Sequence, residues 1–365
     1  MKRVPSQLVY PCFLVLIGSL FGSASTASQI TKVTYLPKPG EYKYTFGQHK
    51  LVMRLKPGWV VETMTEDCYD GRVKSPQDIP TRVIPADHDN PQTGPFYIEG
   101  AEPGDALAVH LITLEPARDH GISSYFPNFG ALSGTSYTAL LHPPLPEKVW
   151  WYEINRQNNT VRFKALSGSY TLEIPMRPFL GCLGVAPAHS EARWTVVPEA
   201  FGGNMDFPEV KAGNTIYLPV SVKGALLFLG DGHLVQGDGE IIGTAVEAAL
   251  KVTFAVDVVK NWNLNWPRVE SDDYLMSVGS YRPLEDAFRI AHKDMIEWLV
   301  NDFGLEMMDA YQLLSQVGMA KIAQVVDPNY TVAACLPKKY LPAAAKLTTP
   351  HDKLKSIRDK IKGSS

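Results

Sequence analysis

Residues 203–247 gather polar side chains and glycines between short apolar runs. The carboxylates, amides and single imidazole of this segment are Asn204, Asp206, Asp231, His233, Gln236, Asp238, Glu240 and Glu247. Glycine beside such groups allows the backbone to approach a ligand closely and to turn with a positive φ. The segment therefore predicts a functional site built on strand ends and turns.

The same segment predicts strands. Apolar runs at 215–222 and 225–229 have strand length, and the Lys-Gly pair between them predicts a hairpin. Because residues i and i+2 of a strand point to the same face, Asp231 and His233 are expected to aim the same way. The loop at 236–240 then joins two strands, and such loops are where binding and catalytic groups concentrate.

Six short stretches of the sequence, several of them rich in glycines and acids, occur in a characteristic order. They read GGNMD at 202–206, LPV at 218–220, GDGHLVQGDGE at 230–240, TGPFYIEGAEPGDALAVHL at 93–111, AYQLLSQVG at 310–318 and VVDPNYTV at 325–332. In this order they resemble the acetamidase/formamidase family. The resemblance implies hydrolysis of a small linear amide, and it implies a homo-oligomer, since family members form oligomers.

The first 27 residues have the layout of a secretory signal peptide. Lys2 and Arg3 precede an apolar core at 8–21, and small residues follow at 25–27. An uncleaved anchor is the alternative, but the core is shorter than the ~20 residues that a membrane span needs. We therefore expect a periplasmic or secreted protein that does not contact the membrane after cleavage.

The remainder predicts a mainly β protein with a sandwich-like core. Strand-length runs fill 28–280, which we assign to the catalytic region. Apolar residues at helical spacing over 285–301 and 306–317 predict a smaller α+β part at 281–345, and 346–365 is expected to be a solvated, charged tail. A hydrophobic content of 45% and a net charge of -3 fit a globular protein and argue against a nucleic-acid partner.

Outside the leader the sequence has an odd number of cysteines, Cys68, Cys182 and Cys335. One disulfide plus a free thiol and three reduced thiols are both open alternatives. For Cys182, an inert buried thiol is favoured over a nucleophile, because its neighbours are small and apolar.

Signatures of several other enzyme classes are absent. The two Gly-Asp-Gly turns lack the third glycine of a dinucleotide fingerprint, and the sequence has no P-loop, HExxH, paired CxxC or GxSxG motif. Serine hydrolases are therefore disfavoured, and carboxylates with one histidine remain as the candidate chemistry.

Those groups suit metal-assisted amide hydrolysis. A divalent ion polarises the carbonyl and lowers the pKa of bound water to ~7. We predict Asp206, Asp231 and His233 as its ligands, which leaves one position open as in catalytic zinc sites. Zinc is favoured, and calcium or magnesium would be preferred if acids alone line the pocket.

The other predicted roles complete the reaction. Glu240 is expected to act as general base and then as acid toward the departing ammonia. Glu102 or Asp67 would hold the substrate NH2 group, although a turn-capping role for Asp67 is equally open. Asn204 and Gln236 would donate hydrogen bonds to the developing oxyanion.

Three alternatives stand beside this interpretation. The acids and histidine alone are also compatible with a salt-bridged structural cluster. A secreted binding or structural protein would keep the fold without turnover. A hydrolase of larger or cyclic amides would need a wide pocket mouth near the aromatic loop at 125–129. The run DHDNP at 87–91 is interpreted as a solvated turn rather than a ligand set.

Overall fold

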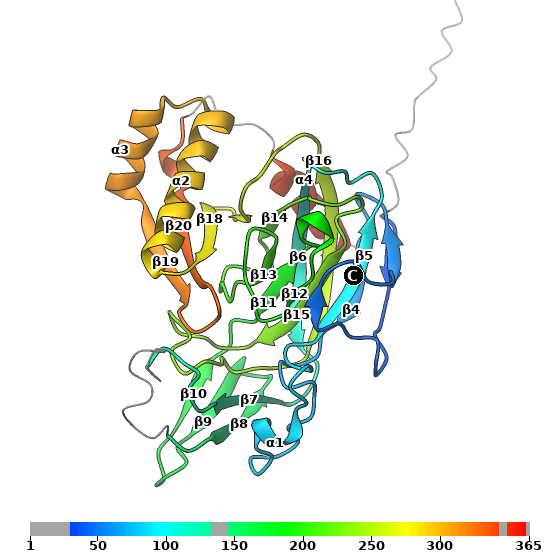
Figure 1. Ribbon diagram of the computed structural model, residues 1–365, viewed down its shortest axis with the longest axis vertical. Helices are drawn as coiled ribbons and strands as arrows, with labels where there is room; N and C mark the ends of the chain where they lie inside the picture. Colours follow the sequence, from blue (N-terminus) through cyan, green and yellow to red (C-terminus); the bar gives the residue numbers. More distant parts are fainter. Residues whose placement is uncertain (1–29, 133–144, 343–348, 363–365) are drawn as a thin grey trace, which may run out of the picture.

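The computed structural model describes residues 30–132, 145–342 and 349–362, and strands make up most of its regular structure (Figure 1). This confirms the prediction of a mainly β protein. The predicted signal peptide lies outside the described residues.

The largest sheet in the described part of the chain has nine strands, most of them antiparallel to their neighbours. In order across the sheet they are β1 (Lys32–Thr34), β4 (Val60–Met64), β16 (Leu250–Val259), β6 (Ala106–Pro116), β14 (Thr215–Pro219), β17 (Arg268–Glu270), β18 (Tyr274–Tyr281), β20 (Tyr330–Pro337) and β19 (Met319–Gln324). The first pair, β1 and β4, is parallel.

A second sheet of five described strands packs against it. Its order is β13 (Gly202–Asn204), β11 (Phe179–Gly184), β15 (Leu227–His233), β5 (Gln92–Ile98) and β3 (Met53–Leu55). Two smaller sheets comprise β10 (Thr171–Pro175), β9 (Thr160–Lys164), β8 (Lys148–Asn155) and β7 (His120–Tyr125), and the pair β12 (Arg193–Trp194) and β2 (Thr45–Phe46).

The two large sheets share one hydrophobic core, as the predicted sandwich requires. Along β6, Leu107, Val109 and Leu111 pack into this core, together with residues from β5, β11 and β15. Ala106 and Ala108 point to the opposite face, because side chains alternate along a strand. The middle of the nine-stranded sheet is therefore buried on both faces.

Three of the four α-helices in the described ranges cover that opposite face. The helices are α1 (Pro80–Val83), α2 (Leu284–Phe303), α3 (Met307–Val317) and α4 (Pro350–Lys362), with 3-10 turns at Ala188–Ser190 and Lys338–Tyr340. Trp298 of α2, Leu314 of α3 and Leu354 of α4 all join the second core. In Figure 1, α2 and α3 lie with β18–β20 at one end of the molecule.

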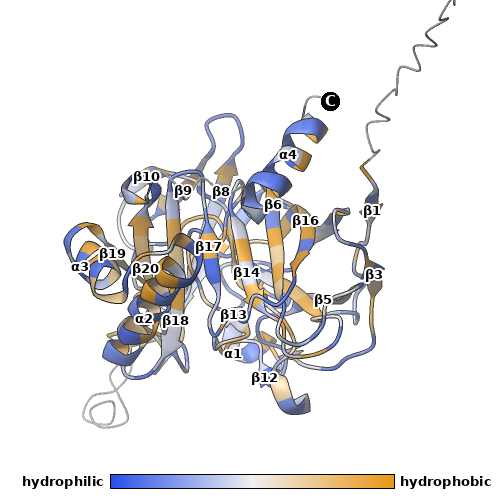
Figure 2. Ribbon diagram, turned by 90° about the horizontal axis from the view of Figure 1, so that it is seen from above, coloured by the Kyte–Doolittle hydropathy of each residue, from blue (hydrophilic) through white to orange (hydrophobic). Residues whose placement is uncertain are grey.

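The two predicted helices are present, whereas the prediction for the charged tail changes. The helices expected at 285–301 and 306–317 are present as α2 and α3, and Gly304 ends α2 with a left-handed φ of 71°. The charged tail is not simply solvated, because α4 buries His351 and Leu354 completely against the sheet. Figure 2 shows α4 beside β6 and β16. None of the helices in the described ranges is long and apolar enough to span a membrane.

The predicted hairpin between 215–222 and 225–229 is wrong. β14 pairs with β6 and β17, whereas β15 pairs with β11 and β5. Both strands are buried along their whole length, so each serves as an inner strand of a different sheet. The turn with positive φ at Ala225 and Leu226 carries the chain from one sheet to the other.

Candidate active site

The base of the site is the end of β15. His233 Nε2 lies 3.2 Å from Asp231 Oδ2 and 3.0 Å from Glu247 Oε2, and all three side chains are at most 4% exposed. A Cβ on Gly232 would lie 2.4 Å from the Ala248 carbonyl oxygen, so only glycine allows the segment that carries Glu247 to come this close. The prediction that Asp231 and His233 point the same way is confirmed.

Gln236 fixes the orientation of the imidazole. Its Nε2 donates to the carbonyl oxygens of Asp206 at 2.8 Å and Ala323 at 3.0 Å, so its Oε1 accepts from His233 Nδ1 at 2.9 Å. This assignment leaves Nε2 of the ring toward the carboxylates. A cavity of about 300 Å³ lies beside these groups, and Gln236 is not among the residues that line it. The structure therefore places Gln236 behind His233 rather than against a substrate.

Asn204, on β13, connects several other polar groups of the site by hydrogen bonds. Its Nδ2 donates to Asp206 Oδ2 at 3.0 Å and to Asp327 Oδ2 at 2.7 Å. Its Oδ1 accepts from Asn90 Nδ2 at 2.8 Å and from the Cys182 thiol. Asn204 lines the cavity, but these bonds within the protein already occupy its amide.

Gly181 makes room for two of the carboxylates. A Cβ at this position would lie 2.3 Å from Asp231 Oδ2 and 2.5 Å from Asp206 Oδ1. Real side chains do not tolerate such contacts. The glycine of β11 is therefore what lets Asp206, in the segment after β13, converge with Asp231 of β15.

Three of the acids stand on a strained backbone. Asp206, Asp231 and Glu240 have φ values of 45°, 56° and 48°, in the left-handed region that non-glycine residues rarely adopt. Such conformations persist where the surrounding structure fixes them, and they cluster at functional sites.

The loop that carries Glu240 is held by the edge strand β19. Gly239 N donates to the Ile322 carbonyl oxygen at 3.0 Å, and Val325 N donates to the Gly239 carbonyl oxygen at 3.1 Å. Glu240 is 6% exposed and lines the cavity. The C-terminal α+β part therefore helps to position a side chain of the site.

The site holds more negative charge than its histidine can balance. Asp206, Asp231, Glu240, Glu247 and Asp327 are all buried, and none of the described residues that line the cavity is a lysine or arginine. An uncompensated buried carboxylate is costly, so such a group is protonated, paired or bound to a cation.

The pKa values reflect this imbalance. Burial raises the pKa of Glu247 and of Asp327 to about 7, and it raises the pKa of Glu240 well above its usual range. Burial opposes protonation of His233, but Glu247 and Asp231 outweigh it and hold the pKa of that imidazole well above its usual value. Protons and cations therefore compete for the same cluster.

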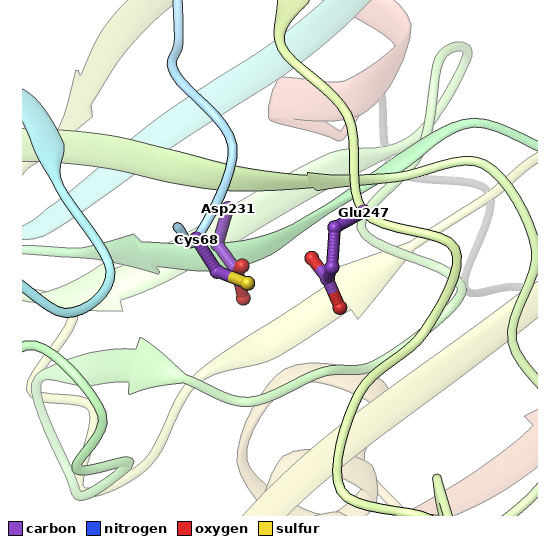
Figure 3. A group of neighbouring side chains, drawn as sticks. All are labelled: Cys68, Asp231 and Glu247. Atoms are coloured by element: carbon purple, nitrogen blue, oxygen red, sulfur yellow. The ribbon is translucent and has the colours of Figure 1, made fainter. Parts of the chain in front are cut away.

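Two groups of side chains have the arrangement that a metal ion needs. One ligand atom from each of Asp206, His233 and Glu240 lies within 4.8 Å of the others, and the same holds for Cys68, Asp231 and Glu247. Figure 3 shows the second group, with the Cys68 sulfur beside Asp231 and facing Glu247. The three predicted ligands are thus brought together, but they are divided between the two groups.

The residues present fit a divalent cation. Asp206 Oδ1 is buried and receives no hydrogen bond from the part of the chain that the structure describes. An imidazole among carboxylates is a donor set that zinc accepts, and carboxylates alone would suit calcium or magnesium.

A cavity of about 300 Å³ opens above these groups. Its polar lining comprises Cys68, Asp89, Asn90, Asn204, Asp231, His233, Glu240, Thr244, Glu247 and Asp327, and its other lining residues are Tyr69, Phe126, Phe129, Trp194, Val196, Gly243 and Pro328. A size of this order is typical of small-molecule sites.

The profile of the acetamidase/formamidase family matches residues 48–191 and 188–341, which is most of the sequence. The chain belongs to this family. An acetamidase from Yersinia enterocolitica is 43% identical, with 87% of this chain and 96% of that chain covered and a TM-score of 0.80.

Two curated relatives are also named as a formamidase and an acetamidase. A formamidase of Methylophilus methylotrophus is 27% identical over 67% of this chain and 75% of its own length. An acetamidase of Mycolicibacterium smegmatis is 30% identical over 46% of this chain and 53% of its own length. The matches thus span between 53% and 75% of the curated relatives' lengths.

Two acids predicted to hold the substrate NH2 group lie elsewhere. Glu102 is on an exposed turn, where Lys223 Nζ lies 3.0 Å from its Oε1 and 48% of its side chain is exposed. It does not line the cavity, so the expectation for Glu102 is wrong. A Pro-Gly turn favours the surface, which is the physical reason.

Asp67 is buried, and its carboxylate accepts hydrogen bonds from the backbone of its own turn. Its Oδ1 accepts from the amides of Tyr69 at 3.1 Å and Gly71 at 2.9 Å, and its Oδ2 accepts from Arg118 at 2.7 Å. This is the turn-capping alternative, and Asp67 is not among the lining residues. Its neighbour Cys68 is the one that faces the cavity.

Several lining residues of this family member had no predicted role. Glu247 was counted in the central segment without a function, and Asp327 lies within the VVDPNYTV stretch. Asp89 and Asn90 line the cavity, so the interpretation of 87–91 as a solvated turn is wrong for these two residues. The Asn-Pro pair that indicated a turn also leads directly into β5. Cys182 is fully buried, and burial raises its pKa well above the usual value, as expected of an inert thiol.

Proposed function

We propose that this chain hydrolyses a small linear carboxamide of the formamide or acetamide type, releasing ammonia and a carboxylate, with the help of a divalent ion. The observation that carries the proposal is the convergence of five buried carboxylates on His233 without a balancing lysine or arginine in the described lining. Family membership and the acetamidase and formamidase names of the relatives support amide hydrolysis.

The ion would be held either by Asp231 and Glu247 with Cys68, or by Asp206 and His233. In the second arrangement Glu240, the third member of that group, would stay free to carry a proton. When bound, a divalent ion polarises the amide carbonyl and makes water a better nucleophile near neutral pH. Zinc is the first ion to test, followed by calcium and magnesium.

A side chain of the protein itself, Glu240, carries the proton during the reaction. A water oxygen forms the bond to the carbonyl carbon, and Glu240 accepts the proton that this water loses. Glu240 then donates that proton to the amide nitrogen as the carbon–nitrogen bond breaks, so ammonia leaves. Burial raises the pKa of Glu240 well above its usual value, which makes its carboxylate a stronger base than an exposed one.

His233 and its partners position this chemistry. Gln236 holds the ring so that Nε2 faces Asp231 and Glu247. Asn204 links Asp327, which lines the cavity, to Asp206, which lies behind that lining. The surrounding burial excludes bulk water, which strengthens each of these electrostatic contacts.

The test is ammonia release from formamide and acetamide by the purified protein. We expect turnover that a chelator abolishes, that re-added ion restores and that His233→Ala removes. A protein that releases no ammonia from any small amide at high concentration would instead support the alternative, a secreted binding or structural protein with this fold.

Two further properties belong to the proposal. We propose that the chain is exported, since its first residues resemble a signal peptide, and N-terminal sequencing of the mature protein should then begin after Ala27. We also propose a homo-oligomer, which light scattering would detect as a mass above that of one chain.

A further inference from the structure

The lining of the cavity is divided into a polar base and an apolar rim. The base consists of the buried acids and His233. The apolar part of the rim is formed by Phe126, Phe129, Trp194 and Val196, none of which is fully buried, and the partly exposed Asp89 also lines the cavity. Trp194 keeps 43% of its surface exposed, although large aromatic side chains are usually covered.

The aromatic rim is fixed rather than loosely placed. Phe126 stacks on Tyr69 with ring centroids 6.3 Å apart and meets Phe129 edge-on at 6.2 Å. Phe129 packs on Gly243, where an added Cβ would lie 2.4 Å from its Cδ1. The Ala131 amide also donates to the Ile241 carbonyl oxygen at 2.9 Å, which ties the aromatic loop to the loop that carries Glu240.

The cavity is larger than formamide or acetamide requires. Its volume of about 300 Å³ has room for many water molecules. Acetamide is much smaller, because its carbonyl carbon carries only one methyl group. A substrate whose carbonyl reaches the acids at the base would leave the aromatic rim uncovered unless its acyl group extended outward.

The charge of the site limits what that acyl group can be. Several buried carboxylates and no lysine or arginine among the described lining residues disfavour an anionic substituent. Aromatic side chains instead bind apolar groups and give the largest contact area for them. The rim therefore suits a neutral, apolar acyl group.

We propose that the rim formed by Phe126, Phe129, Trp194 and Val196 is an acyl-group site, and that the preferred substrate is a primary amide whose acyl group is apolar and larger than methyl. This inference rests on the proposed amidase function, and it moves the preferred substrate from acetamide to primary amides with a larger apolar acyl group. Phenylacetamide and hexanamide are the probes that match the rim.

The experiment compares kcat/KM for acetamide, butyramide, hexanamide and phenylacetamide, measured by ammonia release with the ion-loaded, full-length protein. Burying a methylene group contributes enough to raise kcat/KM about fourfold per added CH2 until the rim is covered. Trp194→Ala should lower the ratio of kcat/KM for phenylacetamide over acetamide by about tenfold or more. Phe126→Ala, a second rim variant, should lower the same ratio.

A matched control is Tyr311→Ala, which removes an aromatic side chain that is 58% exposed on α3, away from the cavity. It should leave both the ratio and the activity unchanged. Because the ratio is taken on one protein sample, partial misfolding of a variant cancels.

The outcomes separate this inference from the proposed function. If acetamide is hydrolysed but kcat/KM falls as the acyl group lengthens, or the rim variants leave the ratio unchanged, the acyl-group site is overturned and the amidase proposal stands. If no amide of the series is hydrolysed, both are overturned.

Discussion

The histidines of two buried clusters in this chain have pKa values shifted in opposite directions. In the candidate site, His233 lies among buried carboxylates that hold its pKa well above the usual value. In the second cluster, His110 of β6 and His351 of α4 both contact the Thr215 hydroxyl at 2.9 Å, and burial lowers the pKa of His110 to about 3.

The difference separates a site for chemistry from a structural contact. The His110 cluster is neutral, and it fastens α4 to the nine-stranded sheet, with Asp272 at 3.2 Å from His351 as its only acid contact among the described hydrogen bonds and ion pairs. The His233 cluster keeps surplus negative charge, strained backbone and an adjoining cavity. Buried histidines as such do not mark function; unbalanced charge beside a cavity does.

The largest expected effect comes from the proposed proton carrier. Glu240→Gln keeps the shape of the side chain but cannot accept a proton, so kcat for acetamide should fall by about 10²–10⁴-fold. Steady-state ammonia release measures it, and circular dichroism checks that the fold is kept. Retention of most of the activity would show that another group moves the proton.

The second effect is on stability and comes from His110. Its pKa is about 3 in the folded chain against a usual value of 6.5, so the unfolded chain binds the proton more readily. Stability contributed by neutral His110 is therefore present above pH 6.5 and lost as the pH falls toward 3. The loss is at most about 1.4 kcal/mol per pH unit.

Urea unfolding at a series of pH values measures this loss, and His110→Asn is the comparison because it cannot titrate. The free energy of unfolding of the variant should fall less steeply over that window. Parallel pH profiles for the two proteins would mean that His110 is not the group that titrates.

A smaller effect is expected from His351→Ala. The change removes one of the two histidine partners of the buried Thr215 hydroxyl and should cost about 1–3 kcal/mol of unfolding free energy. The kcat/KM for acetamide should stay the same, since α4 lies on the face of the sheet opposite the shared core. A loss of activity without a loss of stability would contradict the structural role of this cluster.

The smallest effect is expected at Glu102. Its ion pair with Lys223 is exposed on both sides, so Glu102→Gln should change the unfolding free energy by less than about 1 kcal/mol. Acetamide turnover should not change. A marked rise in KM would return Glu102 to the substrate site.

Local patterns in the sequence predicted part of this architecture. The contact between Asp231 and His233 followed from strand alternation, and α2 and α3 followed from apolar spacing, because both depend on neighbours in the chain. The family resemblance added that the glycine-rich segments belong to one site.

The rest depends on which distant segments meet. Asp327 joins the site only because Asn204 bonds it at 2.7 Å across the fold, and Glu247 joins because Gly232 lets its segment approach. The hairpin failed for the same reason: two buried strands adjacent in sequence belong to different sheets. Glu102 is the opposite case: it lies in one of the motifs, yet it does not line the cavity.

Elemental analysis of the purified protein tests the central claim most directly, which is that the surplus carboxylates around His233 bind a cation for catalysis. We predict about one or more divalent ions per chain, with the content falling in Asp206→Asn and in His233→Ala. A protein that releases ammonia from acetamide while holding no divalent ion would contradict this account.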